Sequence, residues 1–421
     1  MALSALASDG ASILFALCMV GLYGLGGCLV LYVRPMFQKR EQGLCAAALL
    51  LAGLFLRLSM FEHISGDYVS FLSIWTDTMA GMTAREALST PIGDYNMPYL
   101  YVILLISRLP FYDLYCIKLF SVLFDVAAAL AVGYLVKMLT KQDLPTLLAF
   151  AAALFAPTTW LNSSYWGQCD SVYGALALWG LYCGLSDRPR CSMVLLALSL
   201  SFKLQAVFIL PIVAFFLVTG RVSLRQLLLF PAGFLGAMVP ALLGGRSFHD
   251  TFSIYIDQTG AYPYLSLNAP SFWSLIPNDY FYELSAAPVL LAMVLTLLVL
   301  FVFLGKYPRL DGESLVELAL IFALLIPWSL PKMHERYFYL AEMLSIVYVC
   351  LYPKRLPVGV GLLLGGLMIY SAYLFGGVPV LSMGAVALGY GLILLYLIPV
   401  LYLRIKKSES MNLKGDITHG N

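Results

Sequence analysis

The sequence predicts an all-α, polytopic membrane protein, and both its composition and its apolar runs indicate this fold class. Of the 421 residues, 61% are hydrophobic and 11% are charged, whereas globular domains carry roughly a quarter charged residues. The mean hydropathy is +0.87, and the apolar residues gather in about thirteen runs typical of membrane helices. The net charge of +2 and the lack of a basic run with interleaved aromatic residues exclude nucleic acid as a partner.

Each expected membrane helix is an apolar run of about 20 residues, or a shorter run whose ends neighbouring helices bury. The expected helices cover residues 12–33, 43–60, 114–136, 144–160, 172–185, 192–202, 206–218, 226–243, 286–304, 314–330, 337–351, 358–375 and 383–403. The run 98–109 is short and should lie in the interface or re-enter. The first run lacks a basic flank and exceeds a secretory signal core, so residues 1–40 should hold a retained additional span. We predict one membrane domain, residues 1–405, and a disordered cytoplasmic tail, residues 406–421.

Lys and Arg orient these helices, since short cytoplasmic loops carry an excess of both residues. One orientation places most of the 25 Lys and Arg residues inside, with the amino terminus outside and the tail inside. The cations left on or near the outer face are Arg57, Arg85, Arg108, Lys118, Lys203, Arg246, Lys332 and Arg336. The long polar segments 61–97, 162–171 and 244–282 share that face, so we expect the functional chemistry outside.

The first outer loop, residues 61–97, holds several carboxylates and aromatic rings. Asp67 follows a glycine, which allows a sharp turn and a close ligand approach, as a general base beside a hydroxyl requires. The alternative is that Asp67 caps a helix over residues 68–82. Aromatic residues such as Tyr95 stack on sugars but also anchor membrane interfaces, and anchoring is the favoured interpretation for most of them. The candidate substrate contacts of this loop are Tyr68, Trp75, Asp94 and Asn96.

The second polar segment, residues 162–171, carries amides, hydroxyls and one carboxylate that suit a polyhydroxylated substrate. Its candidate substrate contacts are Trp166, Gln168 and Asp170, joined by Gln205 from a later segment. The alternative for this segment is a helix start capped by Asp170 or Ser171. Lys203 has no acidic neighbour in the sequence, so it either snorkels to the interface or meets a phosphate.

The densest cluster of charge is residues 331–337, with the sequence Pro-Lys-Met-His-Glu-Arg-Tyr, between two apolar runs. Charge near a membrane core marks a functional site by default, because it needs a partner or water. Lys332 and Arg336 would share one face of a helix with Glu335 as counter-ion, which makes a helix-end salt bridge the structural alternative. Together with His334, however, the cations outnumber Glu335 and suit a phosphate or diphosphate.

Taken together, these stretches resemble the GT-C superfamily of polytopic glycosyltransferases. Gly66-Asp67-Tyr68 with Trp75 resembles the first-loop acidic motif of dolichyl-phosphate-glucose-dependent glucosyltransferases, and His334-Glu335 is similar to their His-Glu-Lys. Residues 165–171 and 331–337 resemble the Trp-Gly-Gln-x-Asp and Pro-Lys-Met-His-Glu-Arg patterns of prokaryotic relatives of the second GPI mannosyltransferase. The sequence departs from the family where residues 203–205 lack the proline of Lys-Pro-Gln and where Met97 replaces a second proline.

The resemblance implies a hexosyltransferase, with mannose favoured, that inverts the sugar as it moves it from a polyprenyl-phosphate donor to a lipid- or glycan-linked acceptor hydroxyl. Asp67 is then the catalytic base, and the groups that bind the donor phosphate are Lys203, Lys332, His334 and Arg336. Glu335 joins the substrate contacts. No cofactor is required, although Asp67, Asp94 and Asp170 suit a divalent cation. The implied location is a bacterial cell membrane, with the active site on the outer face and cell-envelope glycan as product.

The rival class is transport of lipid-linked sugars or other solutes, and a scaffold without chemistry is a third possibility. Transporters place charged groups near the middle of the membrane, often at broken helices. Asp125 and Lys203 are the residues that favour transport here. For Asp125 we expect Lys118, two helical turns away on the same helix, as the partner.

Overall fold

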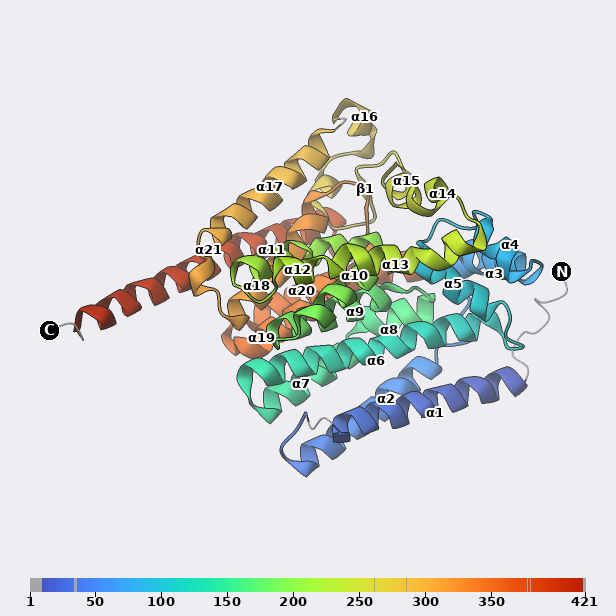
Figure 1. The fold of residues 1–421 in the computed structure, drawn as a ribbon, viewed down its shortest axis with the longest axis horizontal. Helices are drawn as coiled ribbons and strands as arrows, with labels where there is room; N and C mark the ends of the chain where they lie inside the picture. Colours follow the sequence, from blue (N-terminus) through green and yellow to red (C-terminus); the bar gives the residue numbers. More distant parts are fainter. Residues whose placement is uncertain are drawn as a thin grey trace. The chain divides into compact units, whose positions relative to one another are not determined.

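The computed structural model describes residues 10–33, 36–260, 262–284, 286–376, 378 and 380–418, and these are largely helical (Figure 1). Within them, nine helices are long and apolar enough to cross a membrane. They are α1 (Gly10–Val33), α2 (Arg40–Leu58), α6 (Asp113–Thr140), α7 with its extension (Asp143–Trp166), α12 with α13 (Leu224–Gly244), α17 (Ala287–Leu304), α18 (Gly312–Ser329), the Pro353–Phe375 segment that contains α20, and the Met383–Lys407 part of α21. The predicted all-α polytopic membrane fold is confirmed.

The predicted number of thirteen spans is not confirmed, because four of the expected spans are shorter helices. They are α9 (Asp170–Leu185), α10 (Pro189–Phe202), α11 (Pro211–Val218) and α19 (Tyr339–Leu351). Even the 16 residues of α9 reach only about 24 Å, less than a hydrocarbon core of about 30 Å. The helix α5 (Met97–Ile106) occupies the run expected not to cross, and its 10 residues are far too few to span.

The described chain forms two compact units, and each is described by itself. Unit 1 comprises residues 1–183, 190–206 and 227–261, and unit 2 comprises residues 184–189, 207–226 and 262–421. In unit 1, α1 packs against α2 and α6, and α7 packs against α2 and α6, so these four helices lie side by side (Figure 1). The prediction of one membrane domain over residues 1–405 stays a prediction.

Short helices follow α2 in unit 1 and carry the first polar loop. They are the π-helical turn Tyr68–Leu72, α3 (Ser73–Ala80), α4 (Ala84–Ser89) and α5. A buried cluster that includes Tyr68, Trp75 and Tyr99 packs these helices together. The loop before α5 approaches Trp75 so closely that a Cβ on Gly93, whose φ is +72°, would lie 2.8 Å from the indole ring.

Two buried cations fix the carboxyl-terminal end of α2 in unit 1. Arg57 pairs with Asp125 of α6 at 2.6 Å, and both side chains are fully buried. Lys118 of α6 instead donates to the carbonyls of Met60, Phe61 and His63, at 3.0, 2.9 and 2.7 Å. The expected pair of Lys118 with Asp125 was therefore wrong, because the ammonium group binds backbone carbonyls of the turn that follows α2, and Asp125 pairs with Arg57.

In unit 2, α18 is buried among α11, α17, α19 and α21. A two-stranded parallel sheet pairs β1 (Ser266–Leu267) with β2 (Met333–His334). At the predicted inner end of unit 2, the fully buried Glu317 carboxylate of α18 accepts Arg355 at 3.5 Å and Arg404 of α21 at 2.8 Å. These ion pairs tie three apolar segments together.

The helix α21 (Met383–Thr418) continues beyond the membrane span into residues for which we expected a disordered tail. Propagating an existing helix adds one hydrogen bond for each residue fixed, so an anchored helix extends more readily than an isolated one forms. Residues 419–421 of that predicted tail lie outside the described residues.

Candidate functional site

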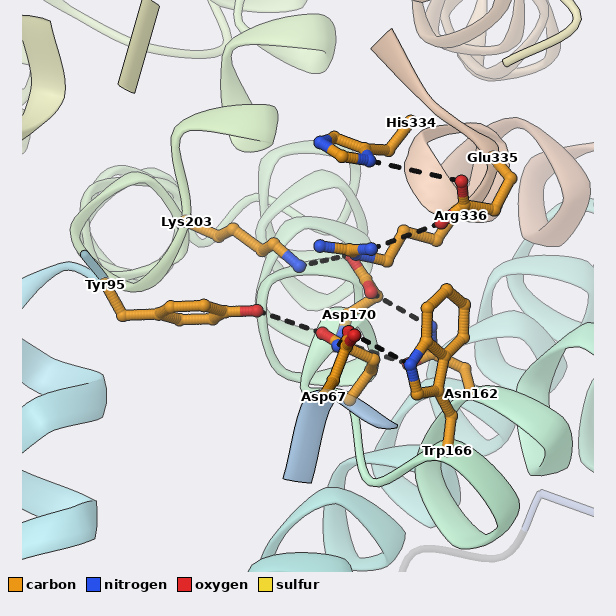
Figure 2. A network of polar contacts seen from close by, with 10 residues as sticks. Asp67, Tyr95, Asn162, Trp166, Asp170, Lys203, His334, Glu335 and Arg336 are labelled. Carbon is orange, nitrogen blue, oxygen red and sulfur yellow. Dashed lines mark hydrogen bonds and ion pairs between the residues drawn. The ribbon is translucent and has the colours of Figure 1, made fainter. Parts of the chain in front are cut away.

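Asp67 of unit 1 lies where the chain leaves α2 and enters the π-helical turn Tyr68–Leu72. Its side chain does not cap that turn. Instead, its Oδ2 atom accepts two hydrogen bonds, one from Trp166 Nε1 at 3.0 Å and one from Gln168 Nε2 at 2.5 Å (Figure 2). The capping alternative is therefore wrong, and two of the predicted outer motifs meet at this carboxylate.

The segment from residue 161 to residue 168 is shaped to present both of these donors. It forms a π-helical turn, Leu161–Trp166, which ends at Gly167 with a φ of +84°. After Gly167 the backbone folds back toward the start of this turn, and Gln168 N donates a hydrogen bond to Asn162 O at 2.8 Å. Ser65 Oγ donates to Trp166 O at 2.6 Å and accepts from Tyr68 N at 3.2 Å, so one side chain joins the two loops.

Asp170 and Lys203 form a buried ion pair in the same unit. Lys203 Nζ lies 2.6 Å from Asp170 Oδ1, with side chains 9% and 0% exposed. Asn162 Nδ2 donates to Asp170 Oδ2 at 2.9 Å, and Asp170 N donates back to Asn162 Oδ1 at 3.3 Å. Lys203 thus finds the anion that its sequence neighbours do not supply. Ser171, the other proposed cap, donates to the Ser121 carbonyl at 2.9 Å.

Tyr95 is a part of this network that sequence reasoning assigned to interfacial anchoring. Its hydroxyl donates to Gln168 Oε1 at 2.9 Å (Figure 2). Its ring centroid lies 5.7 Å from Lys203 Nζ, within the range of a cation–π interaction. The position of Tyr95 between Asp94 and Asn96, both selected as substrate contacts, was the available signal.

The other predicted contacts of the first loop serve packing and loop closure within unit 1. Tyr68 and Trp75 belong to the buried cluster. The Tyr68 hydroxyl donates to Asp113 Oδ1 at 2.5 Å, and burial together with that carboxylate raises the pKa of Tyr68 above its usual value. Gln258 Nε2 donates to Asp94 O at 2.7 Å and to Asn96 Oδ1 at 3.0 Å, which closes the loop before α5.

Gln205 lies in the 3₁₀ turn Leu204–Ile209 that follows Lys203. Its Oε1 atom is buried and accepts no hydrogen bond from the described residues. Among those residues there is also no group of three His, Cys, Asp or Glu side chains arranged to hold a metal ion.

The predicted phosphate-binding cluster lies in unit 2, in a turn and a short strand between α18 and α19. Lys332 has a φ of +62° and its N–H donates to Leu265 O at 3.0 Å, which brings residues 333–334 into β2. The shared helical face expected for Lys332 and Arg336 is therefore absent, because strand pairing sets the backbone there. Burial lowers the pKa of Lys332 from its usual value.

Glu335 is the buried anion at the centre of that cluster, with its side chain 1% exposed. Arg336 Nη1 donates to Glu335 Oε1 at 3.2 Å, and His334 Nδ1 lies 4.0 Å from Glu335 Oε2 (Figure 2). The expected counter-ion role of Glu335 is confirmed. The His334 ring packs edge-on against Tyr262 and Tyr337, with centroids 6.1 and 5.2 Å apart.

The structure thus joins Asp67 to Trp166 and Gln168, pairs Asp170 with Lys203, and gathers residues 332–336. The first two groups belong to unit 1 and the third to unit 2. No family model matches the chain, and no curated protein matches it in sequence. Fold and apolar helices define a multi-pass integral membrane protein.

Proposed function

We propose that this protein is an inverting membrane hexosyltransferase that moves a sugar, with mannose favoured, from a polyprenyl-phosphate donor to an acceptor hydroxyl on the outer face. The observation that carries the proposal is the environment of Asp67. Two nitrogen donors, from an indole and an amide, bind its Oδ2 atom. Its Oδ1 atom accepts no hydrogen bond from the described residues, so one oxygen is fixed while the other is available to an acceptor hydroxyl.

In the proposed reaction, the acceptor oxygen forms a bond to C1 of the sugar as its proton passes to Asp67 Oδ1. The bond between C1 and the phosphate oxygen breaks, and that oxygen leaves with the electron pair as lipid phosphate. Attack opposite to the leaving group inverts the configuration at C1. A general base contributes typically about 10²- to 10⁴-fold to such a step.

The cations of residues 332–336 are the proposed binding groups for the donor phosphate. The two positive charges of Lys332 and Arg336 outnumber the single negative charge of Glu335, and His334 adds a further hydrogen-bond donor. Fixed cations in a poorly solvated site stabilise negative charge as it develops on a leaving group. Lys203 is paired with Asp170. In the proposed complex its ammonium group therefore binds the Asp170 carboxylate and the phosphate of the sugar donor at the same time.

The test of the base is Asp67→Asn, which keeps the shape and removes the ionisable group. Purified protein in lipid vesicles receives radiolabelled polyprenyl-phosphate mannose and a membrane glycolipid extract, and released polyprenyl phosphate and labelled product are measured. We expect at least about a 100-fold loss of transfer. Asp77→Asn, on the exposed face of α3, is the matched control and should retain activity. Unchanged transfer by Asp67→Asn would remove Asp67 as the base.

Transport is the competing function, and the residues that favoured it in the sequence are Asp125 and Lys203. Both residues have close ionic partners in unit 1, Arg57 and Asp170. Breaking a buried ion pair is unfavourable because it leaves an uncompensated buried charge, whereas a transport site needs charges that exchange partners with a solute. Uptake of labelled lipid-linked sugar into vesicles, without release of polyprenyl phosphate, would favour transport.

A further inference from the structure

Tyr95 is the first member of a chain of hydrogen-bonded side chains that leads through Gln168 to Asp67. The Tyr95 hydroxyl donates to Gln168 Oε1 at 2.9 Å, and Gln168 Nε2 donates to Asp67 Oδ2 at 2.5 Å (Figure 2). All three residues belong to unit 1. Gln168 is buried, with 4% of its surface exposed, so water is a poor substitute for either partner.

We infer that Tyr95 is a positioning residue that fixes the amide of Gln168 so that its nitrogen faces Asp67. This inference rests on the proposed function of Asp67 as the base. An ionised carboxylate only accepts hydrogen bonds, so the nitrogen end of the amide must face it. The oxygen end then requires a donor on the opposite side, and the hydroxyl of Tyr95 supplies it. Two partners at opposite ends hold the amide in one orientation.

The ring of Tyr95 is itself held in place by its neighbours. Its centroid lies 5.5 Å from that of Trp75 and 4.9 Å from that of Tyr99, and Lys203 Nζ lies 5.7 Å away. Phenylalanine retains the ring and these contacts, so Tyr95→Phe removes the hydroxyl with little change in packing. The variant therefore probes the link to Gln168 and leaves the aromatic cluster intact.

The experiment measures how Tyr95→Phe changes transfer from polyprenyl-phosphate mannose, in the full-length protein in vesicles. We expect kcat to fall about five- to tenfold, the effect of one hydrogen bond, with the KM for the donor unchanged. In a chain that already carries Gln168→Leu, the same substitution should change kcat less than about twofold, because the intermediate amide is gone. Equal losses in the two backgrounds would overturn the inference.

Tyr101→Phe is the matched control, since it removes another tyrosine hydroxyl from the same region. That hydroxyl accepts from Ala241 N at 3.1 Å and has no link to Asp67 among the hydrogen bonds of the described residues. We expect a lower midpoint of thermal unfolding and an unchanged kcat. A kcat loss as large as that of Tyr95→Phe would show that any missing hydroxyl in this region has the same effect, which contradicts a specific role for Tyr95.

Thermal unfolding separates this inference from the proposed function. The four chains of the Tyr95 and Gln168 cycle are unfolded in detergent, where no substrate is needed. Coupling between the two substitutions, with no transfer by any chain, would reject the proposed function and keep the Tyr95–Gln168 link. Additive shifts in the unfolding midpoint, with normal transfer by the wild type, would reject the link and keep the function.

Discussion

Arg57 illustrates how much a single buried side chain determines in this fold. Besides Asp125, its guanidinium group binds the carbonyls of Gly53 and Leu154, at 3.1 and 3.0 Å. Ser163 Oγ donates to the same Asp125 oxygen at 2.6 Å. The ion pair therefore joins α2, α6 and the segment that leads to Trp166, and all of these belong to unit 1.

We predict that Arg57→Met destabilises the protein by about 3–5 kcal/mol, because it leaves the Asp125 carboxylate buried without its ionic partner. Chemical unfolding in detergent, followed by tryptophan fluorescence, measures the change. The double variant Arg57→Met with Asp125→Leu should recover most of the loss. Arg40→Met, on an exposed position of α2, is the control and should stay within about 0.5 kcal/mol of the wild type.

Prediction from the sequence worked best where a residue could be selected by its type and motif, without knowledge of its partner in the fold. Asp67, Trp166 and Gln168 were selected by type and motif, and the structure brings them together. Partner assignment failed where it relied on nearness along one helix, since Lys118 was paired with Asp125 for that reason. Asp125 binds Arg57, which lies 68 positions earlier in the chain, and only tertiary packing reveals such a neighbour.

At the scale of elements, two left-handed glycines of unit 1 have different roles. Gly93, with φ +72°, sits against the indole of Trp75, so both its backbone and the space around it exclude a side chain. Gly167, with φ +84°, has no atom within 4 Å of the position that a Cβ would take, so only its backbone angle requires glycine. The first glycine thus serves packing, and the second serves the turn that aims Gln168.

We predict that Gly93→Ala lowers stability more than Gly167→Ala. The latter costs only backbone strain, about 1 kcal/mol, whereas the former adds a contact of 2.8 Å with Trp75. For transfer activity we expect the larger loss from Gly167→Ala. Gly167 directly precedes Gln168, so a change in its backbone angles shifts the side-chain amide of Gln168. Thermal unfolding and transfer assays of both variants provide the comparison. If Gly167→Ala leaves transfer unchanged, the turn does not control the orientation of Gln168.

Element boundaries show why the alternative of a helix-end salt bridge fails for the unit 2 cluster. Residues 331–337 have the spacing of an ion-paired helix, yet β1, more than 60 residues earlier in the chain, captures residues 333–334 as a strand. A two-residue strand leaves no alternating pattern long enough to be recognised in a sequence. The apolar helices, in contrast, depend on local composition, and nine of the thirteen expected spans correspond to long apolar helices of the described chain.

At the scale of the whole molecule, the proposal depends on which loops face outward. The distribution of Lys and Arg predicts residue 62 outside and residue 141 inside. In a chain whose native cysteines are replaced, Glu62→Cys should react with a membrane-impermeant maleimide on intact cells. Lys141→Cys should react only after the membrane is opened. Both positions are exposed in the structure. The reverse labelling pattern would place Asp67 on the cytoplasmic side and contradict an outer-face reaction.

The ammonium group of Lys118 reaches three carbonyls of the chain that leads to Asp67. It therefore links the first polar loop to the amino-terminal part of a 28-residue membrane helix. A helix of that length adjusts its tilt to the thickness of the surrounding bilayer. A change in lipid chain length that tilts this helix is therefore expected to move the backbone at residues 60–63, four to seven residues before Asp67.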